Sequence, residues 1–272
     1  MTTAGLARPL LLGLTLYAVL CLLLFLVQRK MMYFPAQTSE AEALSRAAAQ
    51  GLKPWRTGEG RLIGWRPAVS QSTATRLLVF HGNAGSALDR DYLLPVLGGR
   101  NREVVFFEYP GYGARPGSPS QAALVDAAAE ALAQLGSERE GRVWLVGESL
   151  GTGVAAQLAA RDPGAVAGLL LVTPIARASE VAAQHYPFLP VRWLLRDRWD
   201  SVVALRNYRG PVAILIAGQD EVVGADQGRR LATAMAGRPR IWEQPTAGHN
   251  SLDFRPTAAP WPEVAAWLDH PE

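Results

Sequence analysis

The sequence contains one cysteine, two lysines and four histidines among its 272 residues. A single cysteine excludes a disulfide framework and a cysteine-based zinc site. The phosphate-binding pattern GxxxxGK[ST], the zinc pattern HExxH and the EF-hand loop are also missing from the chain. The sequence therefore predicts chemistry that requires no metal or organic cofactor.

The charges are unevenly distributed along the chain, whose formal net charge is +3. Residues 1–66 hold eight Lys or Arg against three acids, whereas residues 67–272 hold nineteen against twenty-one. A mildly acidic main part and the lack of lysine tracts argue against binding to nucleic acid. The basic N-terminal quarter is better explained by contact with anionic lipid. The apolar fraction of 49% excludes an intrinsically disordered chain.

Charged residues are absent from 10–27, which reads LLLGLTLYAVLCLLLFLV. As a helix this run would be about 27 Å long, close to the hydrocarbon thickness of a bilayer. A cleaved signal peptide is the alternative, but the run is longer than a usual signal core and bulky MMYFP follows it. We therefore expect a retained single-pass anchor over 1–30. The basic residues after the run outnumber those before it, which favours a cytoplasmic main domain.

After this run, short apolar segments alternate with helical patterns. Strands are expected at 61–66, 77–80, 104–107, 143–146, 166–172, 212–217 and 241–243, and helices at 121–135, 150–160, 225–236 and 261–268. Such alternation is typical of an α/β fold, with a mostly parallel, doubly wound sheet between two layers of helices. The sequence thus predicts one α/β domain over 61–272. Residues 31–60 are expected to form a linker that carries a short helix.

The alternation lapses over about 176–208, where we expect a short helical cap inserted over the sheet edge. This interval contains HYPFLP and then a segment predicted to be one helix. Apolar residues at helical spacing define the expected buried face of that helix: Val191, Leu195, Trp199 and Val202.

A candidate nucleophile, Ser149, stands at the centre of the sequence Gly147-Glu148-Ser149-Leu150-Gly151. An expected strand precedes this GxSxG pattern and an expected helix follows it. In such a turn the serine projects above the sheet, and the two glycines allow the strand and the helix to approach closely. The alternative is a structural serine that caps the helix.

Serine needs a base to take its proton and a carboxylate to orient that base. Of the four histidines, only His249 lies in a loop after the last expected strand; the others are His81, His185 and His270. A solvated loop histidine is the alternative interpretation of His249. Its position nevertheless suits a base that approaches from the carboxyl edge of the sheet.

The candidate acid is Asp220, which follows the strand at 212–217 in the sequence GQDEVV. A turn-forming aspartate is its alternative role, and Glu221 is the backup acid. The order Ser149, Asp220, His249 is the order that this fold uses for such a triad. The Gly-rich loop HGNAGS at 81–86 offers the backbone N–H of Asn83 as one oxyanion donor, and Leu150 offers the other. An ordinary βα loop is the alternative there.

Five motifs in this order, HGNAG, YPGYG, GESLGTG, GQDEVV and AGHN, resemble those of the α/β-hydrolase superfamily. Within it the chain is similar to a single-span, membrane-anchored group that includes abhydrolase-domain depalmitoylases, and to serine aminopeptidase-like hydrolases. The resemblance implies nucleophile Ser149, acid Asp220, base His249 and oxyanion donors at Asn83 and Leu150.

Three positions depart from that group: Glu108 replaces a usual Asp, Arg115 a usual Ser, and Gly224 a common Pro. None of them belongs to the triad. We expect Arg115 near the pocket mouth, where it would alter which substrates enter. The sequence EYPGYG at 108–113 is expected to form a wall of the pocket.

Together these features predict a membrane-anchored serine hydrolase that cleaves a carboxylic ester or thioester through an acyl-enzyme. The aromatic residues of the cap and the nearby bilayer favour a small-molecule or lipid-like acyl substrate: Tyr186, Phe188, Trp193 and Trp199. Two alternatives stay open, an aminopeptidase-like enzyme on the same fold and a non-catalytic scaffold that binds a lipid or protein. An intact triad favours catalysis, because a binding module does not need it. Nothing in the sequence indicates an oligomeric state.

Overall fold

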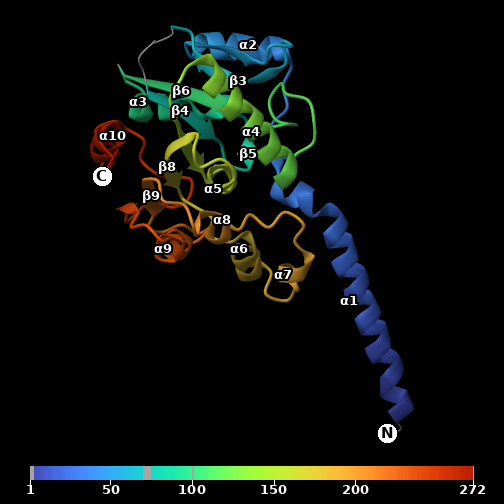
Figure 1. Ribbon diagram of the computed structural model, residues 1–272. Helices are drawn as coiled ribbons and strands as arrows, with labels where there is room; N and C mark the ends of the chain where they lie inside the picture. The colour runs from blue at the N-terminus through green and yellow to red at the C-terminus, as the bar shows by residue number, and fades with distance from the viewer. Residues whose placement is uncertain (1–2, 70–74, 100, 272) are drawn as a thin grey trace.

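A long helix projects from an α/β body in the computed structural model, which describes residues 3–69, 75–99 and 101–271 (Figure 1). Eight strands form the central sheet in the order β10-β9-β8-β7-β4-β6-β3-β2. The strands from β10 to β6 run parallel, whereas β3 and β2 are antiparallel to their neighbours. The structure thus confirms the predicted α/β fold with a mostly parallel sheet.

The strands of the sheet are β2 (Leu52–Arg56), β3 (Leu62–Pro67), β4 (Thr75–Phe80), β6 (Arg102–Phe107), β7 (Val143–Glu148), β8 (Val166–Val172), β9 (Val212–Ala217) and β10 (Arg240–Gln244). Two further short strands, β1 (Phe34–Pro35) and β5 (Ala84–Gly85), pair with each other in parallel. The helices are α1 (Thr3–Met32), α2 (Glu40–Ala49), the 3-10 helix η1 (Ala87–Leu93), α3 (Leu94–Leu97), α4 (Gln121–Glu138), α5 (Leu150–Arg161), α6 (Ala178–His185), α7 (Val191–Leu194), α8 (Ser201–Leu205), α9 (Ala225–Ala234) and α10 (Trp261–Asp269).

The core lies in two layers, one on each face of the sheet, because successive side chains of a strand point to opposite faces. In β4, Leu78 and Phe80 join the layer under α4, α5, α8 and α9. Leu77 and Val79 join the layer under α2, α3 and α10. All four side chains are fully buried. Apolar residues on both faces explain why the central strands read as continuous apolar runs in the sequence.

The sheet begins before residue 61, because β2 pairs antiparallel with β3 inside the segment predicted to be a linker. Its sequence, LKPWR, carries two charges and a proline, which are features of an edge strand. Only Leu52 and Trp55 of this strand are buried. Such a short, polar strand gives little signal of its own in the sequence.

The cap region 176–208 contains three short helices, α6, α7 and α8, so the prediction of one helix with a face from Val191 to Val202 was wrong. The chain leaves the helical conformation after α7, and Trp199 adopts a positive φ of 39°. The next helix starts anew at Asp200, whose carboxylate accepts a hydrogen bond from the backbone N–H of Val203 at 2.9 Å. Helical spacing of apolar residues does not reveal such a break when each short piece buries its own residues.

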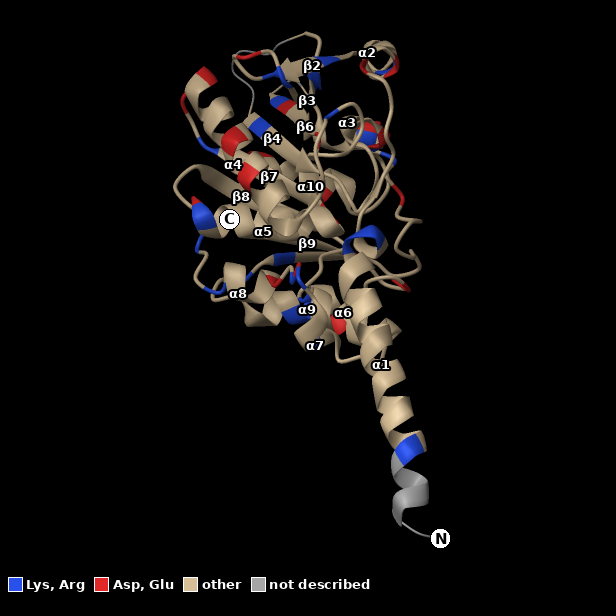
Figure 2. Cartoon of the chain, turned by 90° about the vertical axis from the view of Figure 1, so that its right-hand side faces the viewer, with Lys and Arg blue, Asp and Glu red and all other residues tan. Residues whose placement is uncertain are grey.

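Helix α1 carries a long uncharged stretch between Arg8 and its last turn, where basic residues return next to the body (Figure 2). Among the described residues it is the one helix long and apolar enough to cross a membrane, over Arg8–Met32. Length and composition alone do not distinguish such a span from a signal sequence near the N-terminus. The apolar helix predicted at the N-terminus is confirmed.

The last turn of α1 is fastened to the cap by a buried carboxylate. Arg29 donates two hydrogen bonds to Asp197, at 2.9 and 3.0 Å, and the Tyr33 hydroxyl donates a third at 3.0 Å. The Asp197 side chain is only 5% exposed, whereas that of Arg29 is 38% exposed. The indole N–H of Trp199 donates to the Tyr33 hydroxyl at 3.2 Å and extends the network into the cap.

We expect Arg29→Met to lower the free energy of unfolding by about 1–3 kcal/mol, because it leaves a buried carboxylate with one remaining donor. The loss should be smaller than for a fully buried pair, since solvent reaches the guanidinium. Thermal unfolding of the full-length protein in detergent measures the effect. The neighbouring variant Lys30→Met removes an exposed charge and serves as the control. Equal melting temperatures for the two variants would contradict this role of Asp197.

Candidate active site

Ser149 lies at a sharp turn between β7 and α5, in a strained backbone conformation with φ 51° and ψ −116°. A Cβ on Gly147 would lie 2.5 Å from the carbonyl oxygen of Gly151, and a Cβ on Gly151 would collide with the carbonyl of Phe80. Both glycines are therefore required by the close approach of strand and helix. The turn is fastened by Thr152, whose hydroxyl donates to the carbonyl of Ser149 at 2.6 Å.

The structure brings together the three side chains predicted to form a triad. His249 Nε2 lies 3.1 Å from Ser149 Oγ, and His249 Nδ1 lies 2.7 Å from Asp220 Oδ2. The three residues follow β7, β9 and β10, and parallel strands place such loops at one edge of the sheet. The sheet thus brings together in space three residues that are far apart in the sequence.

Asp220 is held in one orientation by its own turn. Its second oxygen, Oδ1, accepts hydrogen bonds from the backbone N–H groups of Val222, Val223 and Gly224 at 3.0, 2.8 and 3.3 Å. Burial acts to raise the pKa of Asp220, but the contact with His249 and the backbone donors outweigh it, so the pKa is lowered. The carboxylate is therefore ionised at neutral pH and suited to hold Nδ1–H of the imidazole.

We expect the stability that Asp220 contributes to decrease in acid, because its folded-state pKa lies below the ordinary value of 3.8. For a carboxyl group with a lowered pKa, the contribution is complete above that ordinary value and is lost as the pH falls below it. The melting-temperature gap between wild type and Asp220→Asn should therefore stay constant above about pH 5 and narrow as the pH falls below about pH 4. A gap that is constant or widens towards acid would contradict this expectation.

Glu221, the backup acid, contacts the histidine loop in a different way. The backbone N–H of His249 donates to Glu221 Oε2 at 3.2 Å, and no bond joins Glu221 to the imidazole ring among the described residues. Glu221 thus supports the backbone of the loop that carries His249, while Asp220 contacts its ring.

The two predicted oxyanion donors, Asn83 and Leu150, both line the cavity next to Ser149. The loop that carries Asn83 is fixed from outside the cavity. The carbonyl of Asn83 accepts from the backbone N–H of Phe34 at 2.9 Å and from the Tyr112 hydroxyl at 2.8 Å. Leu150 is the first residue of α5, where backbone N–H groups lack a partner within the helix.

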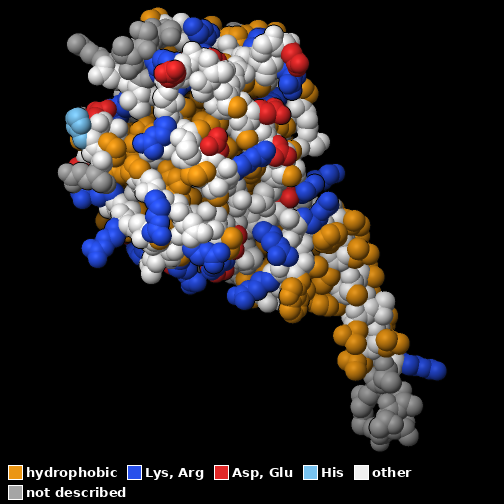
Figure 3. All heavy atoms as spheres, in the orientation of Figure 1, with side chains coloured by type: hydrophobic (Ala, Val, Ile, Leu, Met, Phe, Trp, Pro, Cys, Tyr) orange, Lys and Arg blue, Asp and Glu red, His pale blue; other side chains and the backbone are white. Residues whose placement is uncertain are grey.

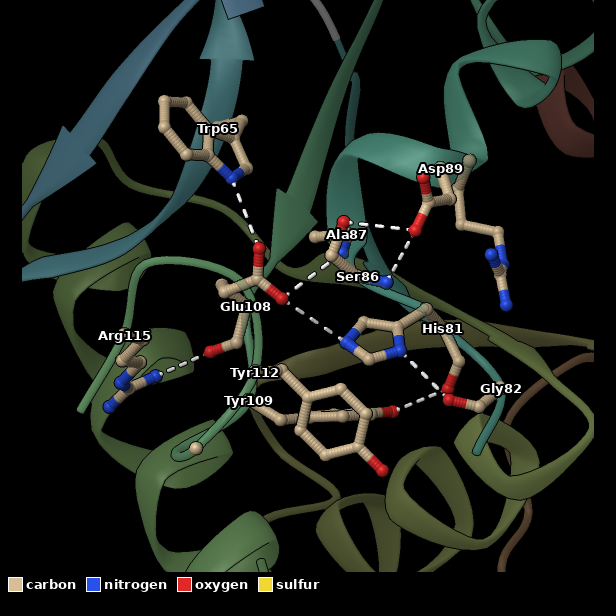
Figure 4. A network of polar contacts seen from close by, with 12 residues as sticks. Trp65, His81, Gly82, Ser86, Ala87, Asp89, Glu108, Tyr109, Tyr112 and Arg115 are labelled. Atoms are coloured by element: carbon tan, nitrogen blue, oxygen red, sulfur yellow. Dashed lines mark hydrogen bonds and ion pairs between the residues drawn. The ribbon is translucent and has the colours of Figure 1, made fainter. Parts of the chain in front are cut away.

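A buried polar network, which the sequence did not reveal, lies beneath this loop (Figure 4). Glu108 is fully buried and accepts from the indole N–H of Trp65 at 3.3 Å and from the backbone N–H of Ala87 at 3.0 Å. His81 Nε2 lies 3.5 Å from the same carboxyl group, and its Nδ1 contacts the carbonyl of Gly82 at 2.8 Å. The one feature of the sequence that could have indicated this network is Glu108 itself, which stands where the similar group usually has Asp. A longer side chain at this position reaches Trp65 and η1 together.

Two expectations about the neighbouring turn were wrong. Arg115 does not line the cavity; it is buried, its Nη1 donates to the carbonyl of Glu108 at 2.7 Å, and burial lowers its pKa to about 10. None of the residues 108–113 lines the cavity either. The turn folds back on itself, since the N–H of Gly111 donates to the carbonyl of Arg115. Tyr109 instead supports the loop that carries Asn83, since its hydroxyl donates to the carbonyl of His81 at 2.8 Å.

Ser149 faces a mainly apolar cavity of about 310 Å³. One part of its lining comes from the cap, from Ile175 just before the cap and from the Asp220 loop: Ile175, Ala178, Val181, Ala182, His185, Tyr186, Leu189, Val191, Leu194, Leu195, Trp199, Val222 and Val223. The other part comes from α1, which the sequence did not place near the site: Leu24, Phe25, Gln28, Met31 and Met32. In a helix that is apolar on all sides, no pattern distinguishes a cavity-lining residue from a lipid-facing one.

Comparisons with known proteins agree with this fold. Residues 75–200 match the family described as alpha/beta hydrolase fold. An uncharacterized protein of Mycobacterium tuberculosis strain H37Rv is 36% identical over 232 residues, which cover 84% of this chain and 82% of that protein. The lysophosphatidylserine lipase ABHD12 of Danio rerio is 33% identical over 197 residues, 65% of this chain. The chain spans about half the length of that lipase, 51%.

Solved structures with the same architecture include a lipase and an esterase. A monoacylglycerol lipase of Paleococcus ferrophilus has a TM-score of 0.54 and 19% identity, over 72% of this chain and 95% of that chain. An esterase of Pyrococcus furiosus has a TM-score of 0.60 and 14% identity, over 86% of this chain and 98% of that chain. At these identities the likeness concerns the fold.

Proposed function

Because the chain belongs to the α/β-hydrolase superfamily, we propose that it is a membrane-anchored serine hydrolase that cleaves a carboxylic ester or thioester. The observation that carries the proposal is the hydrogen-bonded series Ser149, His249 and Asp220, with distances of 3.1 and 2.7 Å, at an apolar cavity. A scaffold that only binds a lipid has no need of this arrangement. The lipase and esterase among the similar proteins support the same reaction class.

The reaction begins when Ser149 Oγ attacks the substrate carbonyl carbon and His249 Nε2 takes the hydroxyl proton. Asp220 holds Nδ1–H, which fixes the tautomer and stabilises the imidazolium that forms. Collapse of the tetrahedral intermediate breaks the bond to the alcohol or thiol, and His249 gives this leaving group its proton. Water then attacks the acyl-Ser149 ester with His249 again as base, which releases the carboxylic acid and restores Ser149.

Backbone N–H groups of Asn83 and Leu150 are the proposed donors to the oxyanion of each tetrahedral intermediate. Each such donor is typically worth about 2.7–4 kcal/mol of the barrier. The fixed positions of both residues support this role. The Asn83 loop is held by Phe34 and Tyr112, and Leu150 is held by the turn at Ser149.

The proposed anchor is α1, in which no residue of the apolar stretch Arg8–Met32 is fully buried. A largely exposed apolar stretch of this length would be poorly soluble in water, whereas it matches the thickness of a bilayer. The basic residues at its C-terminal end favour a cytoplasmic position of the catalytic body. Protection of that body from protease in sealed, right-side-out vesicles is the expected result. Removal of α1 during export would contradict the proposed anchor.

An active-site-directed fluorophosphonate probe tests the catalytic proposal. We expect wild type to be labelled and Ser149→Ala to be unlabelled when both proteins are folded to the same extent. If wild type resists labelling as strongly as Ser149→Ala does, the enzyme proposal fails. Ester, thioester and aminopeptidase substrates assayed side by side test the reaction class. Faster turnover of the aminopeptidase substrates would overturn the preference for acyl substrates.

A further inference from the structure

In the C-terminal part of α1, from Cys21 to Met32, one side is partly buried and the other side is exposed. The partly buried positions recur at helical spacing: Cys21, Leu24, Phe25, Gln28, Arg29 and Met32. The exposed apolar positions lie between them: Leu22, Leu23, Leu26 and Val27. This division gives a helix of uniform hydropathy two different faces, one towards protein and one towards the surroundings.

Polar contacts hold the protein-facing side of α1 in one position relative to the cap. The Gln28 amide donates to the carbonyl of Leu194 at 3.0 Å and accepts from the backbone N–H of Arg196 at 2.8 Å. About 16 Å further along the helix, the Tyr17 hydroxyl donates to the carbonyl of Phe188 at 2.8 Å. Contacts at both ends of this interval fix the helix as part of the folded body.

The fixed face of α1 forms one wall of the cavity that contains Ser149. Met32 lies at the reacting end, because its carbonyl accepts from the Asn83 side chain at 3.2 Å. From Met32 back to Leu24 the wall extends about 12 Å along the helix axis. A wall of this length is suited to a chain that leads away from Ser149.

The part of the cap that contains Phe188 and Trp193 lies beside α1. Hydrophobic side chains are exposed at the molecular surface here (Figure 3). Phe188 is 64% exposed and Trp193 is 84% exposed. Met31 and Tyr186 line the cavity and are also exposed, so they belong to its rim. In the proposed membrane setting these side chains would contact lipid, and the Tyr17 hydrogen bond would satisfy a loop carbonyl there. An apolar chain at this rim would therefore already be in contact with lipid.

We propose that α1 is a wall of the acyl-binding cavity, so that the anchor helix itself selects the acyl chain of a membrane-resident substrate. The proposal rests on the proposed hydrolase function and deepens it. Its occupant is the acyl chain of the ester or thioester attacked by Ser149. Leu24 and Phe25 contact the chain at the end far from the reacting carbonyl, and Met32 contacts it near Asn83.

Substitutions at Leu24 and Leu23 form a matched test, because the two leucines are adjacent but only Leu24 lines the cavity. Full-length protein in phosphatidylcholine nanodiscs is assayed with p-nitrophenyl butanoate and dodecanoate. We expect Leu24→Trp to lower the dodecanoate-to-butanoate ratio of kcat/KM about tenfold, because the indole is larger than the leucine side chain and fills the far end of the cavity. Leu24→Phe should lower this ratio less. Leu23→Trp and Leu23→Phe should keep the wild-type ratio.

The outcomes distinguish failure of the wall proposal from failure of the proposed hydrolase function. If Leu24→Phe and Leu24→Trp keep the wild-type ratio, or if the Leu23 variants change it equally, the wall proposal is overturned while the hydrolase proposal stands. If wild type hydrolyses neither ester and resists the fluorophosphonate probe, the proposed function fails first. A graded fall at Leu24 alone supports α1 as the selecting wall. The phenylalanine variant keeps the test decisive if the tryptophan variant does not fold.

Discussion

Replacing Ser149 by alanine should lower kcat for ester hydrolysis about 10⁶-fold, because the chain then lacks the atom that forms the acyl-enzyme. His249→Ala should cause a loss of similar size, since Ser149 Oγ has its proton acceptor 3.1 Å away at His249 Nε2. The double variant Ser149→Ala/His249→Ala should lose no more than either single variant. Groups that act as a unit are strongly non-additive in this way.

Steady-state kinetics on the three variants, with equal melting temperatures as the folding control, measure this prediction. Independent losses that multiply in the double variant would contradict a shared step.

Asp220→Asn should cost about 10⁴-fold in kcat, because an amide at this position favours the wrong tautomer of His249. Glu221→Gln is its matched control, since Glu221 accepts from the backbone N–H of His249 and, in the described part of the chain, does not bond to the imidazole ring. A loss in Glu221→Gln as large as that in Asp220→Asn would show that the acid was assigned to the wrong residue.

The parts of this fold that follow from the sequence are those with strong local patterns. The strands β8 and β9 match their predicted ranges, because both are continuous apolar runs buried on both faces. The motif around Ser149 was informative because β7 and α5 approach each other so closely that a Cβ at Gly147 or Gly151 would clash with the backbone. Asp220 and His249 could be proposed because loops after parallel strands meet at one edge of the sheet.

What the sequence did not reveal depends on contacts between distant segments. Arg115 was expected at the pocket mouth, but a folded-back turn buries it behind Glu108. The cavity-lining role of Leu24 depends on how α1 lies against the cap, which a uniformly apolar sequence does not specify. The edge strand β2 has too few buried residues to produce a pattern of its own.

Replacing Glu108 by alanine should lower the free energy of unfolding by about 3–5 kcal/mol, because the carboxyl group is the shared acceptor of a fully buried network. The substitution leaves the N–H groups of Trp65 and Ala87 without this partner, at a site where water does not reach. It also removes the acidic group 3.5 Å from His81 and leaves a cavity. Thermal and denaturant unfolding measure the loss.

Glu108→Gln separates the volume of the side chain from its two acceptor oxygens. The amide can accept from only one of the two N–H donors and turns its own NH₂ towards the other, so we expect a loss of about 1–3 kcal/mol. Because Ala87 directly follows the loop that carries Asn83, this variant should also lower kcat about tenfold with little change in KM. Glu130→Ala, on the exposed side of α4, should change stability by less than about 0.5 kcal/mol. A Glu108→Gln variant as stable and active as Glu130→Ala would mean that neither the fold nor the oxyanion loop depends on this buried carboxyl group.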